Sequence, residues 1–207
     1  MSDYEEEVFE DQEEQEEQEE NDFEKGSRPE DGKVRYGNVI YLKHDATGKY
    51  LTSVDGENYE EGSGQQKVFT GDDDDDDSQF LVIPLAGKED QMSYEVGFDD
   101  QFRLEHVATG CYLHSHPDIL SPVTHQQEVT CFGGGDASDE NDTWELQAFP
   151  EHEYEEGDYL WHLDIPVVIR HVMTGQTLHS HEESIDDDKY EVTGYVGTDD
   201  NDKWQAV

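Results

Sequence analysis

Apolar residues in this chain come in short runs that are separated by polar turns. Around 39–44 and 79–83 the runs are strand-like, and turn residues recur roughly every 8–12 positions. No stretch keeps the i, i+3, i+4, i+7 apolar spacing of an amphipathic helix for three turns. The pattern therefore predicts an all-β fold made of short strands.

The same sequence segment occurs three times along the chain. Residues 42–53 recur at 104–115 and again at 169–180, and all three copies share a His-x-x-Thr-Gly core. The period is 62 residues between the first two copies and 65 residues between the second and the third. Each copy is followed by a valine-containing segment and by an acidic turn that leads into an aromatic residue. The valine segments are 66–70, 127–131 and 190–194, and the aromatic residues are Phe80, Trp144 and Trp204.

Self-similarity at a fixed period indicates a repeat architecture, and each copy has room for four strands. In the first copy the strands fall near 39–44, 49–53, 66–70 and 79–83. The glycine after threonine supplies positive φ between the first two strands, and the acidic turn can cap its own backbone amides. Three units that cannot bury an apolar face alone predict a β-trefoil over residues 37–207. The repeats are expected at about 38–98, 99–164 and 165–207.

Charge divides the chain into two parts. The sequence holds 55 acidic and 12 basic residues, a formal net charge of −43. Residues 1–33 contain 16 of the acids and few apolar side chains, so a disordered acidic tail is predicted at 1–36. Residues 34–207 still hold 39 acidic and 9 basic residues, a net charge of −30. A surface this negative repels phosphates, which excludes nucleic acids and anionic membranes as partners.

The sequence carries no visible targeting signal. The first residues lack the basic and apolar regions of a secretory signal, and no apolar run approaches the ~18 residues of a membrane span. No retention or lipidation motif follows Trp204. We therefore expect a monomer in the cytoplasm or the nucleus, with Cys111 and Cys131 kept reduced.

The histidine and threonine of the repeated core are present in every copy. They are His44, Thr47, His106, Thr109, His171 and Thr174. These histidines could serve as ligands or bases, but function usually breaks the symmetry of a repeat. We therefore interpret these residues as structural, with side chains that tie each hairpin together through hydrogen bonds.

Only the second and third copies continue into a His-Ser-His sequence, His114 with His116 and His179 with His181. Side chains two apart on a strand face the same side, so each pair can present two imidazoles to a ligand. Trefoil lectins bind in shallow pockets between the second and third strands of a repeat, and by analogy these four histidines are the candidate site. Tyr112 and Tyr195 are the candidate stacking surfaces.

Two other kinds of chemistry are not favoured. A zinc ion wants a third or fourth ligand, and no Cys-x-x-Cys or His-Glu-x-x-His sequence accompanies the histidines, so we expect no metal and no cofactor. No nucleophile elbow, Walker loop or dinucleotide fingerprint occurs. A carboxylate pair for acid–base catalysis cannot be singled out among 55 acids, so we expect no enzymatic activity.

The repeated His-x-x-Thr-Gly-x-x-Leu, followed by Gln-x-Val-Thr and Asn-Asp-x-Trp, resembles the MIR domain. That module is shared by protein O-mannosyltransferases, inositol trisphosphate receptors and ryanodine receptors. The copies at 113–116 and 178–181 are most similar to stromal-cell-derived-factor-2-like proteins and to the mannosyltransferase segments. The resemblance covers about 38–207 and implies a β-trefoil binding module without catalysis. This chain departs from the family in two ways. The stromal-factor type has a signal peptide, which is not visible here, and the receptor site relies on clustered basic residues, whereas residues 34–207 hold only nine basic residues.

The resemblance and the candidate residues together imply recognition of a glycan or of a polypeptide client, in protein quality control or glycosylation. The alternative is an interaction protein whose acidic tail binds basic proteins while the trefoil carries it. Salt separates the two hypotheses, because electrostatic capture weakens as ionic strength rises.

The charge on the body leads to a prediction about stability. We predict a lower melting temperature at about 20 mM NaCl than at about 1 M NaCl, because salt screens the repulsion between surface carboxylates. Differential scanning calorimetry of the full chain at both salt concentrations measures this difference. A melting temperature that does not respond to salt would contradict the prediction.

Overall fold

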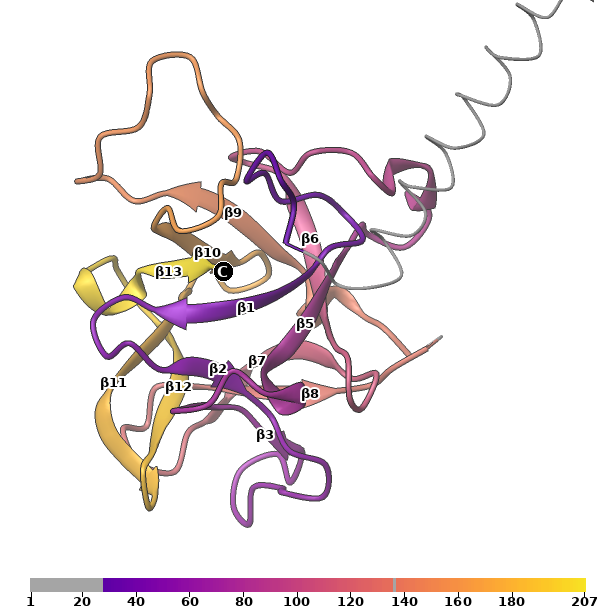
Figure 1. Cartoon of the computed structure of the whole chain (residues 1–207). Helices are drawn as coiled ribbons and strands as arrows, with labels where there is room; N and C mark the ends of the chain where they lie inside the picture. Colours follow the sequence, from indigo (N-terminus) through magenta and orange to yellow (C-terminus); the bar gives the residue numbers. More distant parts are fainter. Residues whose placement is uncertain (1–27, 136) are drawn as a thin grey trace, which may run out of the picture.

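The computed structural model describes residues 28–135 and 137–207, and its framework is a closed six-stranded barrel (Figure 1). The barrel strands are β1 (Val39–His44), β5 (Gln79–Ile83), β6 (Gln101–His106), β9 (Trp144–Ala148), β10 (Val167–His171) and β13 (Trp204–Ala206). Each strand pairs antiparallel with the next, and β13 returns to β1. Closure leaves the barrel without a free edge.

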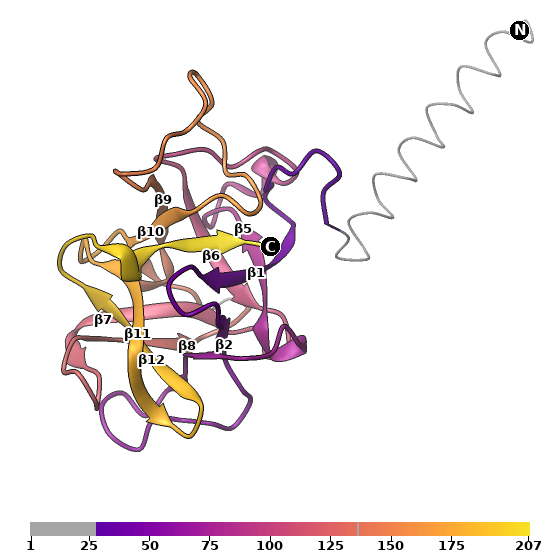
Figure 2. The same ribbon diagram turned by 60° about the vertical axis from the view of Figure 1, so that its left-hand side comes forward.

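Three hairpins cover one end of the barrel. Their strands are β2 (Tyr50–Thr52), β3 (Gln66–Lys67), β4 (Phe69–Gly71), β7 (Tyr112–Leu120), β8 (Gln127–Phe132), β11 (Thr177–Asp186) and β12 (Lys189–Tyr195). The hairpins join one another through the pairs β4–β12, β12–β8 and β8–β3. Figures 1 and 2 both show these strands gathered on the same side of the barrel. The predicted β-trefoil is confirmed.

The strand count differs from the prediction in one place. Among the described residues thirteen strands occur instead of twelve, because the third strand of the first repeat is interrupted at Val68. On one side of Val68, β3 pairs with β8, and on the other, β4 pairs with β2 and β12. In the other two repeats a continuous strand makes the corresponding pairs.

Short 3-10 helices stand where the acidic turns were predicted. They are η1 (Asp76–Ser78), η3 (Glu140–Asp142) and η4 (Asp200–Asp202), and η2 (Glu89–Gln91) lies in a connecting loop. The aspartate that precedes each of η1, η3 and η4 accepts a hydrogen bond from a backbone amide of its turn, as predicted. In the described part of the chain, no helix is long and apolar enough to cross a membrane.

The open end of the barrel is closed by a ring of three backbone hydrogen bonds. Val34 N donates to Trp161 O, Trp161 N to Val96 O, and Val96 N to Val34 O, at 2.8–3.0 Å. All three side chains are fully buried. The three residues are spaced by 62 and 65 positions, the same period as the repeated motif. Each repeat therefore begins a few residues earlier than its first strand.

This ring corrects the predicted boundary of the tail. Residues up to 36 were assigned to the tail, but Val34 and Tyr36 belong to the buried core, and the Tyr36 hydroxyl donates to Gln101 O at 3.0 Å. The prediction failed because the acidic composition of residues 1–33 was taken to continue to the first strand. Residues 1–27, which make up the rest of the predicted tail, lie outside the described residues.

The motif histidine of each repeat bonds in two directions. Its Nδ1 lies 2.8–2.9 Å from the threonine hydroxyl of its own turn, and its Nε2 lies 2.9 Å from a backbone carbonyl of another repeat. The carbonyls belong to Asn201 for His44, Asp77 for His106 and Asn141 for His171. Each imidazole also packs on the aromatic residue that follows that carbonyl, with ring centroids 4.9–5.2 Å apart. These contacts join the repeats in a ring.

The turn that holds each histidine depends on glycine. Gly48, Gly110 and Gly175 adopt φ values of 69–72°, which a residue with a side chain rarely takes. In each turn the amide of this glycine donates to the carbonyl of the motif histidine. The Thr-Gly pair therefore sets the hairpin, and the hairpin places the imidazole against the neighbouring repeat.

The three histidines make stability sensitive to acid. Burial lowers the pKa of His44, His106 and His171 below its ordinary value. The unfolded state therefore binds more protons, and the stability present above pH ~6.5 is lost as the pH falls. Burial also lowers the pKa of His181. It raises the pKa of Glu105 and of Glu128, which acts in the opposite direction, but these are two carboxylates against four histidines.

We predict that the free energy of unfolding falls between about pH 8 and pH 5.5. Urea denaturation at the two pH values measures it. The variant His171→Gln removes one of these histidines, so it should be less stable at pH 8 by about 1–3 kcal/mol and should lose less on acidification. The prediction is wrong if the variant keeps the full pH dependence.

Candidate functional site

His114 on β7 and His179 on β11 occupy equivalent buried positions, each bonded to an aspartate. The Nδ1 of His114 lies 2.9 Å from Asp142 Oδ1, and the Nδ1 of His179 lies 2.9 Å from Asp202 Oδ1. The four side chains are at most 4% exposed. Ionised carboxylates accept hydrogen bonds only, so each aspartate places the ring hydrogen of its histidine on Nδ1 and leaves Nε2 as the acceptor.

The same aspartates also cap the 3-10 turns before the aromatic residues. The second oxygen of Asp142 accepts from Asp139 N at 2.7 Å, and that of Asp202 accepts from Asp199 N at 2.6 Å. In the first repeat the equivalent residues are Thr52 and Ser78, whose hydroxyls lie 2.8 Å apart. The contact between the second strand and the 3-10 turn is thus made by a pair of hydroxyls in the first repeat and by a histidine–aspartate pair in the other two repeats.

An aromatic ring lies beside each of these histidines. Tyr195 stacks on His179 with a centroid distance of 4.5 Å and an interplanar angle of 25°, and Phe132 lies 5.2 Å from His114. Phe132 is 45% exposed and Tyr195 is partly exposed. Phe132 was not among the predicted site residues, although Phe132 pairs across its hairpin with Tyr112 as Tyr195 pairs with Thr177. Gly71 ends the corresponding strand of the first repeat.

The predicted stacking role of Tyr112 is contradicted by its environment. Its side chain is buried, its hydroxyl donates to Gly135 O at 3.1 Å, and the Arg103 guanidinium covers its ring at 5.0 Å. A ring that is covered and fixed in this way cannot receive a ligand. The exposed aromatic surface of the second repeat is Phe132 instead.

The second histidines of the two pairs differ from each other. His181 Nδ1 lies 3.0 Å from His179 Nε2, with the rings at 68°, and its side chain is partly exposed. Its pKa is lowered by burial and, to a lesser extent, by the neighbouring His179. His116 is exposed, and its ring accepts only a long bond of 3.5 Å from Asp118 N. The structure therefore brings three of the four predicted histidines into buried or half-buried networks.

Two groups of ligand atoms come close enough to hold a metal ion. They consist of His114, Asp139 and Asp142 in the second repeat and of His179, Asp199 and Asp202 in the third. Their carboxylate oxygens already accept hydrogen bonds from the turn and from the imidazole. His179 Nε2 and His181 Nδ1 also point at one another with a hydrogen between them. The geometry fits polar caps, in which the atoms that would bind a metal are already hydrogen-bonded.

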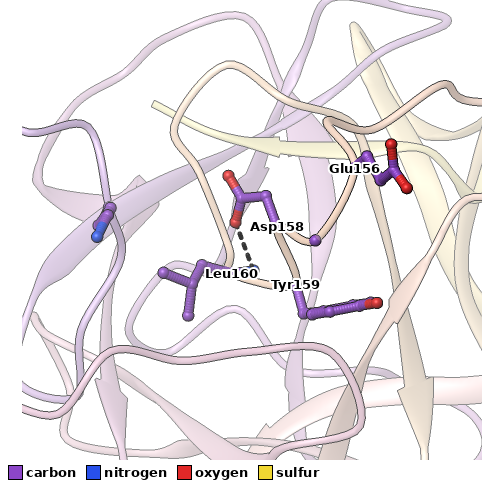
Figure 3. A pocket seen from close by; sticks show the side chains of 6 residues that line it. Glu156, Asp158, Tyr159 and Leu160 are labelled. Carbon is purple, nitrogen blue, oxygen red and sulfur yellow. Dashed lines mark hydrogen bonds between the residues drawn. The ribbon is translucent and has the colours of Figure 1, made fainter.

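A hollow of about 420 Å3 lies in another part of the molecule, between Lys33 and residues 156–160 (Figure 3). Tyr159 beside it is 69% exposed. Beside the hollow, Lys33 Nζ lies 2.8 Å from Glu95, and Asp158 lies 2.7 Å from His162 Nε2 and accepts from Leu160 N at 3.1 Å. None of the predicted site residues lines this hollow.

A β-trefoil is defined by the barrel, the three hairpins and the threefold repetition of the histidine contact. Two of its repeats carry a histidine–aspartate pair beside an aromatic ring. A model of the MIR domain family matches residues 56–204, and the chain belongs to that family.

Curated relatives agree with this assignment. The "Stromal cell-derived factor 2-like protein" of Arabidopsis thaliana is 35% identical over 73% of this chain and 66% of its own length. "Dolichyl-phosphate-mannose--protein mannosyltransferase 1" of Candida albicans is 31% identical over 72% of this chain and 18% of its own length. The crystal structure of the SDF2-like protein from Arabidopsis thaliana superimposes with a TM-score of 0.76 at 32% identity, covering 84% of this chain and 94% of that one. The chain thus spans under two thirds of the first of these proteins and under a fifth of the second.

These relatives overturn the predicted location. The expectation of a cytoplasmic or nuclear protein is wrong, because stromal-factor-2-like proteins and protein mannosyltransferases point to the lumen of the endoplasmic reticulum and the secretory pathway. The prediction relied on the first residues of the chain. The evidence that corrects it lies in the trefoil, which is the part the relatives share.

The hydroxyl pair of the first repeat suggests a double-mutant test of the histidine–aspartate pair. We predict that Asp142→Ser alone destabilises the protein by about 2–3 kcal/mol, because it leaves a buried imidazole and a backbone amide without partners. Adding His114→Thr, which reproduces Thr52 and Ser78, should restore on the order of 1 kcal/mol. Urea denaturation of the two single variants and the double variant measures the coupling. Strictly additive effects would show that the pair is not a unit.

Proposed function

We propose that the protein is a non-catalytic recognition module that binds a glycan or an extended polypeptide client. The binding surfaces are the hairpins β7–β8 and β11–β12, and each presents an aromatic ring beside a histidine. The pairs are Phe132 with His114 and Tyr195 with His179. The observation that carries the proposal is that two repeats have this arrangement of a ring and a histidine. In the first repeat, Gly71 stands in place of the ring and Thr52 in place of the histidine.

The chemistry of these surfaces suits a ligand with both apolar and polar faces. The exposed ring of Phe132 offers apolar contact area, and Tyr195 adds a hydroxyl to its ring. A sugar ring has such a combination of faces, and so does a chain segment with aromatic or aliphatic side chains. Because each surface presents one exposed or partly exposed ring, we expect affinity from several weak contacts and from the use of both repeats together.

The relatives support recognition connected with protein glycosylation. One of them carries "protein mannosyltransferase" in its name, and this chain matches 18% of its length. The segment shared with that enzyme is the module described here, so the shared property we infer is recognition rather than sugar transfer. Within the described residues, the carboxylates nearest the site histidines are committed to capping the 3-10 turns, which also favours a role without catalysis.

The acidic composition supports a second candidate function. With a net charge of −43, the full chain can attract basic proteins without any pocket. Such binding weakens steeply with ionic strength, whereas stacking on an aromatic ring does not. The two functions therefore differ in their salt dependence.

The proposal is tested by titrating the full chain with two probes at physiological salt. The probes are methyl α-D-mannopyranoside and a reduced, carboxymethylated polypeptide, and binding is followed by NMR for the sugar and by calorimetry for the polypeptide. We predict that the double variant Phe132→Ala, Tyr195→Ala binds at least one probe about 3–10-fold more weakly than the wild type. Tyr94→Ala is the matched control, because Tyr94 is 62% exposed and lies outside both hairpins.

Repeating the titrations at about 500 mM NaCl, with a tetralysine peptide as a third probe, separates the candidates. Recognition by the trefoil predicts binding that persists in salt and depends on Phe132 and Tyr195. Binding of tetralysine alone, lost in salt and equal in every variant, would instead support electrostatic capture and would sink the recognition hypothesis.

A further inference from the structure

Asp202, His179 and His181 form a continuous chain of hydrogen bonds at the third-repeat surface. Asp202 Oδ1 lies 2.9 Å from His179 Nδ1, and His179 Nε2 lies 3.0 Å from His181 Nδ1. The carboxylate is fully buried and also accepts from the Thr177 hydroxyl at 2.7 Å and from Asp199 N at 2.6 Å. It is therefore held as a fixed acceptor at the inner end of the chain.

The number of hydrogens in this chain determines the state of its outermost atom. Neutral imidazole carries one ring hydrogen. His179 places its hydrogen on Nδ1 toward Asp202, so its Nε2 must accept. The hydrogen between the rings then belongs to His181 Nδ1, and His181 Nε2 is left with a lone pair. If this chain of hydrogen bonds takes up one proton, a hydrogen appears on His181 Nε2, whichever of the two rings formally holds the positive charge.

We propose that the third-repeat site recognises a hydrogen-bond donor, a hydroxyl or an N–H group, through His181 Nε2, and that one proton converts this atom into a donor. The inference rests on the proposed function and specifies the ligand chemistry of that site. Methyl α-D-mannopyranoside and a polypeptide both carry such donors. Proton uptake reverses the preference, so that carboxylates or phosphates are favoured over hydroxyls.

The environment of His181 Nε2 supports this role. The atom has no hydrogen-bond partner among residues 28–135 and 137–207, although it is shielded from solvent. A buried acceptor without a partner is unfavourable, and a donor on a ligand would relieve that cost. The ring itself is partly exposed on β11, next to His179, on which Tyr195 stacks.

The charged groups around His181 leave this atom free to meet a ligand. The neighbouring titratable side chains are His179, Glu191, Glu183 and Asp199. The Glu191 carboxylate is occupied by the amides of Val123 and Thr124, and Asp199 accepts from Asn201 N. Glu183 is exposed to solvent.

The second repeat provides a control within the same molecule. His114 and Asp142 reproduce the inner bond at 2.9 Å, but His116 is exposed and makes no bond to His114. In the second repeat the chain of hydrogen bonds therefore ends at His114. The two surfaces should differ in the pH dependence of binding.

The first experiment needs no ligand. Long-range 1H–15N NMR correlations of the full chain distinguish a ring nitrogen with a lone pair from one with a hydrogen. At about pH 8 we expect His181 to carry its hydrogen on Nδ1 and a lone pair on Nε2. Acidification below pH ~6.5 should add a hydrogen to Nε2, because burial lowers the pKa of His181. A hydrogen on Nε2 at pH 8 would overturn the proposal.

The second experiment measures binding of methyl α-D-mannopyranoside at about pH 8 and about pH 5.5. The variant Phe132→Ala removes the aromatic ring of the second-repeat surface and keeps the third-repeat surface intact. The variant Tyr195→Ala does the reverse. We expect Phe132→Ala to bind about 2–10-fold more weakly at the lower pH, the value of one hydrogen bond, and Tyr195→Ala to change less. Adding His181→Gln to Phe132→Ala keeps an acceptor that does not titrate, and it should remove the pH dependence.

The two experiments fail in different ways. Equal pH dependence in Phe132→Ala and Tyr195→Ala would overturn the donor proposal while leaving recognition intact. Absence of mannoside binding at both pH values would count against the glycan form of the proposed function, and the NMR titration would then decide the state of His181 independently.

Discussion

The bond between a buried imidazole and a backbone carbonyl of another repeat is the contact on which this trefoil depends. It occurs three times, at His44, His106 and His171, and the bond from His44 to Asn201 O closes the ring. Each imidazole bonds to a carbonyl of the 3-10 turn in the neighbouring repeat, packs on the aromatic ring that follows this turn, and is oriented by a threonine of its own turn. No repeat can bury its apolar face alone, so this contact holds the first and last strands of the barrel together as well as neighbouring repeats.

The candidate site arises where the scaffold was free to vary. The position occupied by Thr52 in the first repeat tolerates a small hydroxyl, which shows that the fold itself requires only a polar contact to the 3-10 turn. Histidine at positions 114 and 179 meets the same requirement through an aspartate and keeps a second ring nitrogen, which at His179 accepts from His181 Nδ1. The scaffold therefore orients the inner nitrogen, while in the third repeat the outer nitrogen extends the chain of hydrogen bonds to His181.

The open end of the barrel shows how composition can hide a structural element. Val34 lies one residue beyond a strongly acidic stretch, yet it is fully buried and completes the ring formed with Val96 and Trp161. The spacing of these three residues equals the repeat period. A hydrophobic residue at that spacing was a usable signal, but the charge of the preceding residues obscured it.

The trefoil could be predicted from the sequence, because periodic turns, alternating apolar residues and a threefold motif are local features that can be counted along the chain. The repeats also indicated a structural role for the shared histidines and made the histidines of the second strands candidates for a binding site. Which side chains meet at that site could not be predicted in the same way. Asp142 lies 28 residues from His114, Phe132 reaches the site across a hairpin, and Tyr112 is covered by Arg103. Such contacts depend on strand register and packing, and these are settled only when the three repeats close on one another.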